Sequence, residues 1–259
     1  MRLARRLPRR LLALPLLACA LVPGLALAAQ VKGRVVGVEK LLNPVWNEAK
    51  ELSAHRFTFR EPSPTVRSDL RNLTAYAPKE VCIAALAEGA QPPPTLPLLV
   101  TVGGGRTTPV TLVVAAGTRV HFENRDPFPH RLYGVGQASF SPGDTASLAS
   151  RDWTPPGPGR YEVRDELAPS LRAWIVVEPL VAAVAYPARD GSFTFANLAA
   201  GKYTLRGYFA GNPVGAPRAV EVGTGNLEVK DALALTEAAP APPDKAAPGK
   251  AGKKHEGGN

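Results

Sequence analysis

The sequence predicts an all-β protein made of packed sheets, and composition and residue pattern both carry that prediction. Glycine and proline together number 51 of the 259 residues, and they are spread between short β-rich runs. Turn-forming residues at this spacing are typical of short strands joined by loops. Long stretches with apolar residues at a 3.6-residue period are absent. We therefore expect strands packed as β-sandwiches.

Residues 1–29 are expected to be a secretory signal peptide. Five arginines within the first ten residues precede an apolar run from Leu11 to Leu27, and Ala26-Leu27-Ala28 fits a small-x-small cleavage site. Prolines and a glycine interrupt the apolar run, which is short for a membrane-spanning helix. We expect cleavage near Ala28 or Ala29, and a periplasmic or secreted protein with no transmembrane segment. A lipid anchor through Cys19 is the alternative.

The folded part of the chain is close to neutral once its ends are set aside. The whole chain carries +9, of which the five signal arginines contribute 5 and residues 238–259 another 2. The high isoelectric point is therefore no evidence for a nucleic-acid partner. Loss of Cys19 with the signal leaves Cys82, so we expect no disulfide within the chain and a buried Cys82 on a strand.

The predicted strands fall into two sets. The first set is interrupted by residues 39–79, which we interpret as an insertion. Within it a short helix is predicted near 64–74, where Val66, Leu70 and Leu73 recur at helical spacing. The predicted strands are 31–36, 81–86, 98–102, 110–114, 119–123, 145–149, 159–163 and 172–177, followed by 181–185, 192–195, 202–208, 218–222 and 227–235.

Residues 119–177 carry a motif layout that points to one family. The stretch opens with Arg-Val-His-Phe-Glu-Asn-Arg-Asp (119–126), reaches His130, and closes with Leu-Arg-Ala-Trp-Ile-Val-Val (171–177). This layout resembles the plastocyanin-like cupredoxins, in which an Asn-x-Asp turn leads to the first histidine ligand and a late Cys-x-x-His-x-x-Met loop supplies the others. The resemblance implies a cupredoxin-like Greek-key sandwich over residues 30–178.

The resemblance also implies that the copper site is degenerate. Aligned on the family's loop, Asp165 takes the place of the cysteine, Ala168 of the second histidine and Leu171 of the methionine, so His130 alone remains of the four ligands. A blue-copper site needs a thiolate, two imidazoles and a weak axial thioether. We therefore expect no metal at these positions and no other cofactor.

A second motif lies within residues 179–236. Arg-Asp-Gly-Ser-Phe-Thr-Phe-Ala-Asn-Leu-Ala-Ala-Gly-Lys-Tyr-Thr-Leu (189–205) has a tight Asp-Gly turn, after which Phe193 and Phe195 alternate inward. It resembles the signature of carboxypeptidase regulatory-like domains, which are small transthyretin-like sandwiches. Strands in this range are few for an independent sandwich, and Gly33-Arg34-Val35 is similar to the missing Gly-x-Val strand.

The predicted strand at residues 172–177 indicates how the two units contact each other. Ala173, Ile175 and Val177 face one way and Trp174 and Val176 the other, so both faces of this strand are apolar. Such a strand is covered on both sides, and we expect the two units to pack against each other here.

Residues 237–259 have no apolar pattern and are expected to be a disordered tail rich in alanine, proline and lysine.

The residues give no support for catalysis. Asp165 and Glu166 are adjacent and would point to opposite faces of a strand, and the glycine run 103–105 lacks the Lys-Ser/Thr of a phosphate loop, so we expect a flexible turn there. We expect an exported, non-enzymatic protein that binds or scaffolds in the cell envelope, with an envelope protein or polysaccharide as partner.

Two alternatives to this function stay open. One is a carbohydrate-binding module, in which Tyr208, Arg206 and Lys202 share an outward strand face and Tyr208 supplies a ring for sugar stacking. The other is copper-dependent electron transfer through non-standard ligands.

Overall fold

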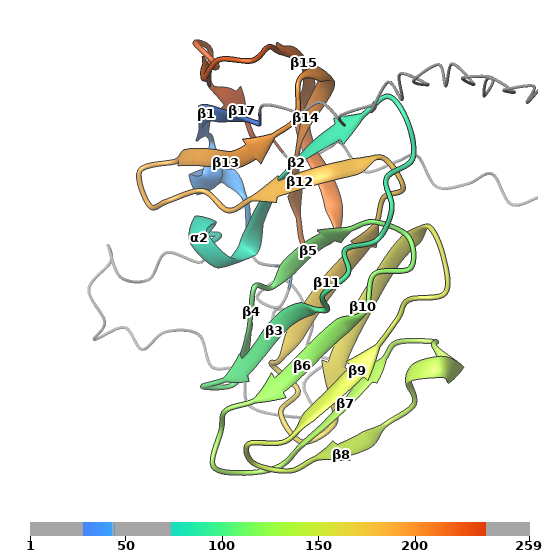
Figure 1. Ribbon diagram of the computed structural model, residues 1–259. Coiled ribbons are helices and arrows are strands. Elements are labelled where there is room, and N and C mark those ends of the chain that lie inside the picture. The colour runs from blue at the N-terminus through green and yellow to red at the C-terminus, as the bar shows by residue number, and fades with distance from the viewer. Residues whose placement is uncertain (1–27, 43, 45–73, 237–259) are drawn as a thin grey trace, which may run out of the picture.

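The computed structural model describes residues 28–42, 44 and 74–236, whose regular secondary structure is mostly β-strand, arranged in four sheets (Figure 1). The expected all-β class is confirmed. Short helical turns interrupt the strands at η1 (Val38–Lys40), α2 (Ala77–Glu80) and η4 (Ala138–Phe140). None of the helices within the described residues is long and apolar enough to cross a membrane. The predicted helix near 64–74, the tail and nearly all of the signal peptide lie outside these residues.

One sandwich is formed by residues 98–177. Its two sheets have the strand orders β4-β3-β6-β9 and β5-β11-β10-β7-β8. In each sheet one pair of strands is parallel, β3 with β6 and β5 with β11, and the other pairs are antiparallel. The strands are β3 (Leu98–Gly103), β4 (Arg106–Thr108), β5 (Thr111–Val114), β6 (Val120–Asn124), β7 (His130–Gly134), β8 (Gly143–Thr145), β9 (Ser150–Trp153), β10 (Gly159–Asp165) and β11 (Arg172–Val177).

A second sandwich combines strands from both ends of the described chain. One sheet has the order β13-β1-β16, with β17 also pairing with β1, and the other has the order β12-β2-β14-β15. Their inward side chains form one core that includes Phe193, Phe195 and Leu205, as the alternation predicted. The strands are β1 (Ala29–Val36), β2 (Val81–Ala87), β12 (Val181–Ala185), β13 (Ser192–Leu198), β14 (Gly201–Phe209), β15 (Asn212–Val222), β16 (Leu227–Glu228) and β17 (Leu233–Ala234).

The strand pairing corrects the predicted boundary of the first unit at residues 30–178. β1 pairs with β13, and β2 lies between β12 and β14, so both strands belong to the second sandwich. The physical reason is burial. Val31 and Val35 of β1 pack into the second core, and β2 has apolar side chains buried on both faces, as suits a central strand. Gly33-Arg34-Val35 therefore lies in a strand of the second sandwich.

The two ends of the predicted insertion, residues 39–79, lie side by side. The amide of Ala75 donates to the carbonyl of Leu41 over 2.9 Å, and Leu42 forms an antiparallel bridge with Thr74. The chain therefore leaves and rejoins the second sandwich at one place. Residues 45–73, the middle of the insertion, are not among those described.

The two sandwiches pack against each other through β11 and β5, which confirms the prediction made from the two apolar faces of residues 172–177. Ala173, Ile175 and Val177 lie in the core of the first sandwich, whereas Trp174 lies in the core of the second. Val176 packs on a third cluster that joins Val113 of β5 to β2 and β14. The contact is both apolar and hydrogen bonded.

Thr111, a buried residue of β5, supplies the polar part of this joint. Its hydroxyl accepts from the amide of Ala210 over 3.1 Å, and its carbonyl accepts from the Tyr186 hydroxyl over 3.2 Å. The guanidinium of Arg160 lies over the Trp174 ring, 4.7 Å from its centroid. Specific polar contacts at a buried joint fix the relative position of the two sheets.

Candidate functional site

His130 lies at the start of a strand that is not among the predicted ones. It is the first residue of β7, pairs with Thr145 of β8, and is fully buried. β7 also pairs with β10, where Asp165 lies opposite Leu132. The strand escaped prediction because its charged and glycine residues hide the alternation. Sheet pairing brings His130 next to a residue 35 positions later.

The imidazole of His130 is held between two carboxylates. Its Nδ1 lies 2.5 Å from Oδ2 of Asp165, and its Nε2 lies 3.1 Å from Oδ2 of Asp126. An ionised carboxylate only accepts hydrogen bonds, so the ring makes both bonds with ionised partners only when both nitrogens carry hydrogen. The cluster Asp126–His130–Asp165 then holds an imidazolium between two carboxylates, and such charge-assisted bonds are the strong ones.

Asp165 is oriented by the backbone of the loop that follows it. Its Oδ1 accepts from the amides of Leu167 over 2.6 Å, Ala168 over 3.0 Å and Arg131 over 3.3 Å. Both oxygens of this buried side chain are therefore engaged, one by the imidazole and one by backbone amides. The loop aligned with the family's ligand loop is folded around a carboxylate.

Asp126 is cradled by the glycine turn at residues 103–105. The amide of Gly104 donates to Oδ1 over 2.7 Å and that of Gly105 to Oδ2 over 3.4 Å. These two glycines have φ values of +61° and +69°, a left-handed conformation that glycine adopts without strain. The Gly104 hydrogen bond, with smaller contributions from His130 and Gly105, lowers the pKa of Asp126 from its ordinary value. Prediction from sequence missed this role of the turn.

Asn124 ties three loops together beneath the cluster. Its side-chain amide donates to the carbonyls of Phe128 over 2.9 Å, Thr145 over 3.0 Å and Ala146 over 3.0 Å. Its side-chain oxygen accepts from the amide of Asp126 over 2.9 Å, which forms the expected Asn-x-Asp turn. This buried residue therefore fixes where Asp126 stands relative to His130.

The residues around His130 do not fit a blue-copper ion. Both ring nitrogens face carboxylates, Ala168 contributes no side-chain donor, and Leu171 is fully buried in the core of the first sandwich. Cys82 lies on β2 in a different cluster, where burial raises the pKa of its thiol to about 12. Among the residues described, no group of three or more His, Cys, Asp or Glu side chains is arranged to hold a metal.

The other predicted site is partly corrected by the structure. Tyr208 is only 3% exposed, because the cluster with Val113 of the first sandwich covers its end of β14, so its ring is not available for stacking on a sugar. Arg206 is half-buried on the same strand face, and Lys202, further along, is exposed. Asp165 is buried and Glu166 exposed, as expected for neighbours on opposite faces.

Comparisons with known proteins give structural likenesses only. Neither the protein-family models nor the curated proteins match this chain. Among solved structures, a copper(I) form of an amicyanin variant is 19% identical, with a TM-score of 0.30 over 37% of this chain and 98% of that one.

Two further solved structures are similar at the same level. A copper-containing nitrite reductase from Thermus scotoductus SA-01 is 24% identical, with a TM-score of 0.29 over 36% of this chain and 25% of the reductase. A purple cupredoxin from Nitrosopumilus maritimus is 16% identical, with a TM-score of 0.27 over 31% of this chain and 99% of that one. Likenesses at this level carry no conclusion about what this chain binds.

Proposed function

We propose that this protein is an exported, non-enzymatic binding or scaffolding component of the cell envelope, in which a cupredoxin-like sandwich is kept without its copper. The observation that carries the proposal is the Asp126–His130–Asp165 cluster. Every side chain of the cluster that could bind a metal is already hydrogen bonded: His130 to two carboxylates, Asp165 to three backbone amides and Asp126 to the glycine turn. Side chains engaged in this way support a structural role for His130.

The cluster joins and orders loops at one end of the first sandwich, as a bound metal does, but it has no redox chemistry. A bound metal joins loops that are distant in sequence and orders them. Here Asp165 joins β7 to the loop after β10, and Asp126 joins β7 to the turn between β3 and β4. We infer that this rigid end positions the surface loops for a partner, which is a task for a scaffold.

Copper titration is the test of this proposal. Cu(II) added to the wild-type protein should give no intense visible thiolate-to-copper band, because Cys82 lies elsewhere and no thiolate is near His130. The triple variant Asp165→Cys, Ala168→His and Leu171→Met should recover part of that band. The variant Ala168→His with Leu171→Met is the matched control, since it lacks the thiolate and should stay colourless. A blue band or tight stoichiometric copper in the wild type would overturn the proposal.

We further propose that the second sandwich is a carboxypeptidase regulatory-like unit completed by β1. What supports this is the Asp190-Gly191 turn, in which Oδ1 of Asp190 accepts from the amide of Ser192 over 3.0 Å and from its hydroxyl over 2.7 Å, together with the buried Phe193 and Phe195 that follow. Binding is the role proposed for this unit.

We propose that the N-terminal segment directs export and is then cleaved. The arginine-rich start and the Ala26-Leu27-Ala28 site predict that the mature protein begins near Ala28 or Ala29. Intact-mass spectrometry of protein purified from the native envelope should give the mass of that mature chain. Retention of Met1 would contradict export with cleavage, and a lipid on Cys19 would replace it by membrane anchoring.

A further inference from the structure

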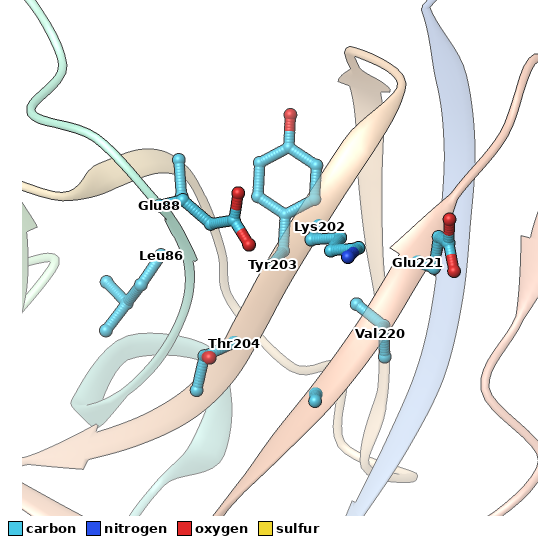
Figure 2. A pocket seen from close by; sticks show the side chains of 9 residues that line it. Leu86, Glu88, Lys202, Tyr203, Thr204, Val220 and Glu221 are labelled. Atoms are coloured by element: carbon cyan, nitrogen blue, oxygen red, sulfur yellow. The ribbon is translucent and has the colours of Figure 1, made fainter.

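An open groove lies on the face of the sheet β12-β2-β14-β15, beside the part that the first sandwich covers. Its volume is about 460 Å³, which is in the range of small-ligand sites, roughly 300 to 1,000 Å³. Figure 2 shows the side chains of β2, β14 and β15 that line it. At the other end of the same face Tyr208 and Cys82 are buried against β5, so a ligand has access only from the end where Lys202 lies.

The groove is built from two rows of side chains that run across the strands. Leu86, Thr204 and Ala219 stand opposite one another in the pairing of β2, β14 and β15 and form the floor. The second row lies two residues further along β14, at the open end of the groove, where Lys202 pairs with Glu221. Glu88 follows Ala87, the last β2 residue paired with β14, and lies on the other side of Lys202 (Figure 2).

This second row alternates in charge as carboxylate, ammonium and carboxylate. Strands stand about 4.8 Å apart, so the row of Glu88, Lys202 and Glu221 spans about 10 Å. All three side chains are exposed, and no ion pair or hydrogen bond of theirs occurs within the described residues. Within the described part of the chain their polar atoms therefore face solvent, and none of the three holds the sheet together by a side-chain contact.

The charge pattern selects the ligand class. A ligand with several negative charges would meet repulsion from the two glutamates, and one with several positive charges would meet repulsion from Lys202 in the middle of the row. Hydroxyl groups both donate and accept hydrogen bonds, so a neutral ligand rich in hydroxyls satisfies carboxylate, ammonium and the Thr204 hydroxyl alike. The exposed Ala219 offers apolar contact for the carbon–hydrogen face of such a ligand, and the largely buried Leu86 closes the floor beside it.

We propose that this groove binds a short neutral saccharide, held by Glu88, Lys202 and Glu221 over the floor of Leu86, Thr204 and Ala219. The inference rests on the proposed binding function and gives that function a ligand class. It moves the site from the predicted Tyr208 to the open end of the same strand face. The buried ring of Tyr208 does not stack on the sugar, so the affinity comes from hydrogen bonds to Glu88, Lys202 and Glu221.

The test is an NMR titration of the mature, isotopically labelled protein with four neutral trisaccharides: maltotriose, cellotriose, xylotriose and fully N-acetylated chitotriose. At least one should give saturable shifts of the Thr204, Ala219 and Glu221 amides. Glu221→Gln and Lys202→Ala should each weaken that binding by roughly tenfold, the loss expected for one hydrogen bond to a charged group. Lys32→Ala, an exposed lysine on the strand β1 of the other sheet, is the matched control and should leave affinity unchanged.

Three outcomes would overturn the inference. They are no shift at these amides with any of the four sugars at millimolar concentration, binding that the groove variants leave unchanged, and saturable shifts with 1,4-diaminobutane or triglutamate in place of the sugars. The copper titration is independent of this result. If the protein binds neither sugar nor copper, the saccharide site is ruled out and the proposal of a sandwich without copper stands.

Discussion

At the scale of the residue, His130 and its two carboxylates differ in how far the sequence reveals them. The family resemblance located His130 and Asp165, because both stand where the family has ligands. Asp126 was visible only as part of an Asn-x-Asp turn. Its role depends on the amides of Gly104 and Gly105, more than 20 residues earlier, which no local pattern connects to it. Partners supplied by sheet pairing and remote turns are therefore the part of the site that sequence reasoning misses.

Removing one carboxylate from this buried cluster should be costly. In Asp165→Asn the His130 ring loses its closest carboxylate, and removing one partner of a buried pair of this kind costs roughly 3–5 kcal/mol. Urea denaturation followed by tryptophan fluorescence measures the loss. Glu166→Gln is the control: this exposed neighbour lies 3.6 Å from Arg131, and a surface pair of that kind contributes about 0–1 kcal/mol. Equal losses in the two variants would contradict the assigned role of Asp165.

At the scale of the element, apolar alternation predicted most strands, missed the polar ones and was wrong at residues 145–149, where only Thr145 lies in a strand. β13 and β14 were found because Phe193, Phe195 and Leu205 alternate with polar residues. β4, with the sequence Arg-Thr-Thr, and β9, with Trp153 as its single buried residue, carry too few apolar positions to show a period of two. Their pairing with β3 and β6 is what makes them strands. Tertiary pairing overrides weak local preference.

The turn between β12 and β13 predicts the outcome of one substitution. Gly191 has φ +84°, and a Cβ added there would lie 2.4 Å from the carbonyl oxygen of Val35 on β1. Gly191→Ala should cost about 2–4 kcal/mol, from left-handed strain plus displacement of β1. Gly136→Ala, with φ +69° and no atom within 4 Å of the added Cβ, should cost only the strain, about 1–2 kcal/mol. Thermal denaturation of both variants measures the difference, and its absence would argue against a close β1–turn contact.

At the scale of the whole molecule, the two sandwiches share buried surface and should unfold together. Trp174 belongs to β11 of the first sandwich, is 6% exposed, and lies in the core of the second. Trp174→Ala should cost about 3–5 kcal/mol, and calorimetry of the wild type should show one transition. Two well-separated transitions, or a first sandwich whose stability is unchanged when residues 180–259 are deleted, would contradict the shared joint.

The position of β1 sets the order in which the chain completes its fold. The polypeptide is synthesised from its N-terminus, so β1 is the first strand to appear. Its partners are β13, β16 and β17, which end at residues 198, 228 and 234. More than 150 residues separate β1 from β13, the first of these partners in the chain, and pairing over such separations is slow. During that interval β1 has no partner strand, and an unpaired apolar strand is prone to aggregation.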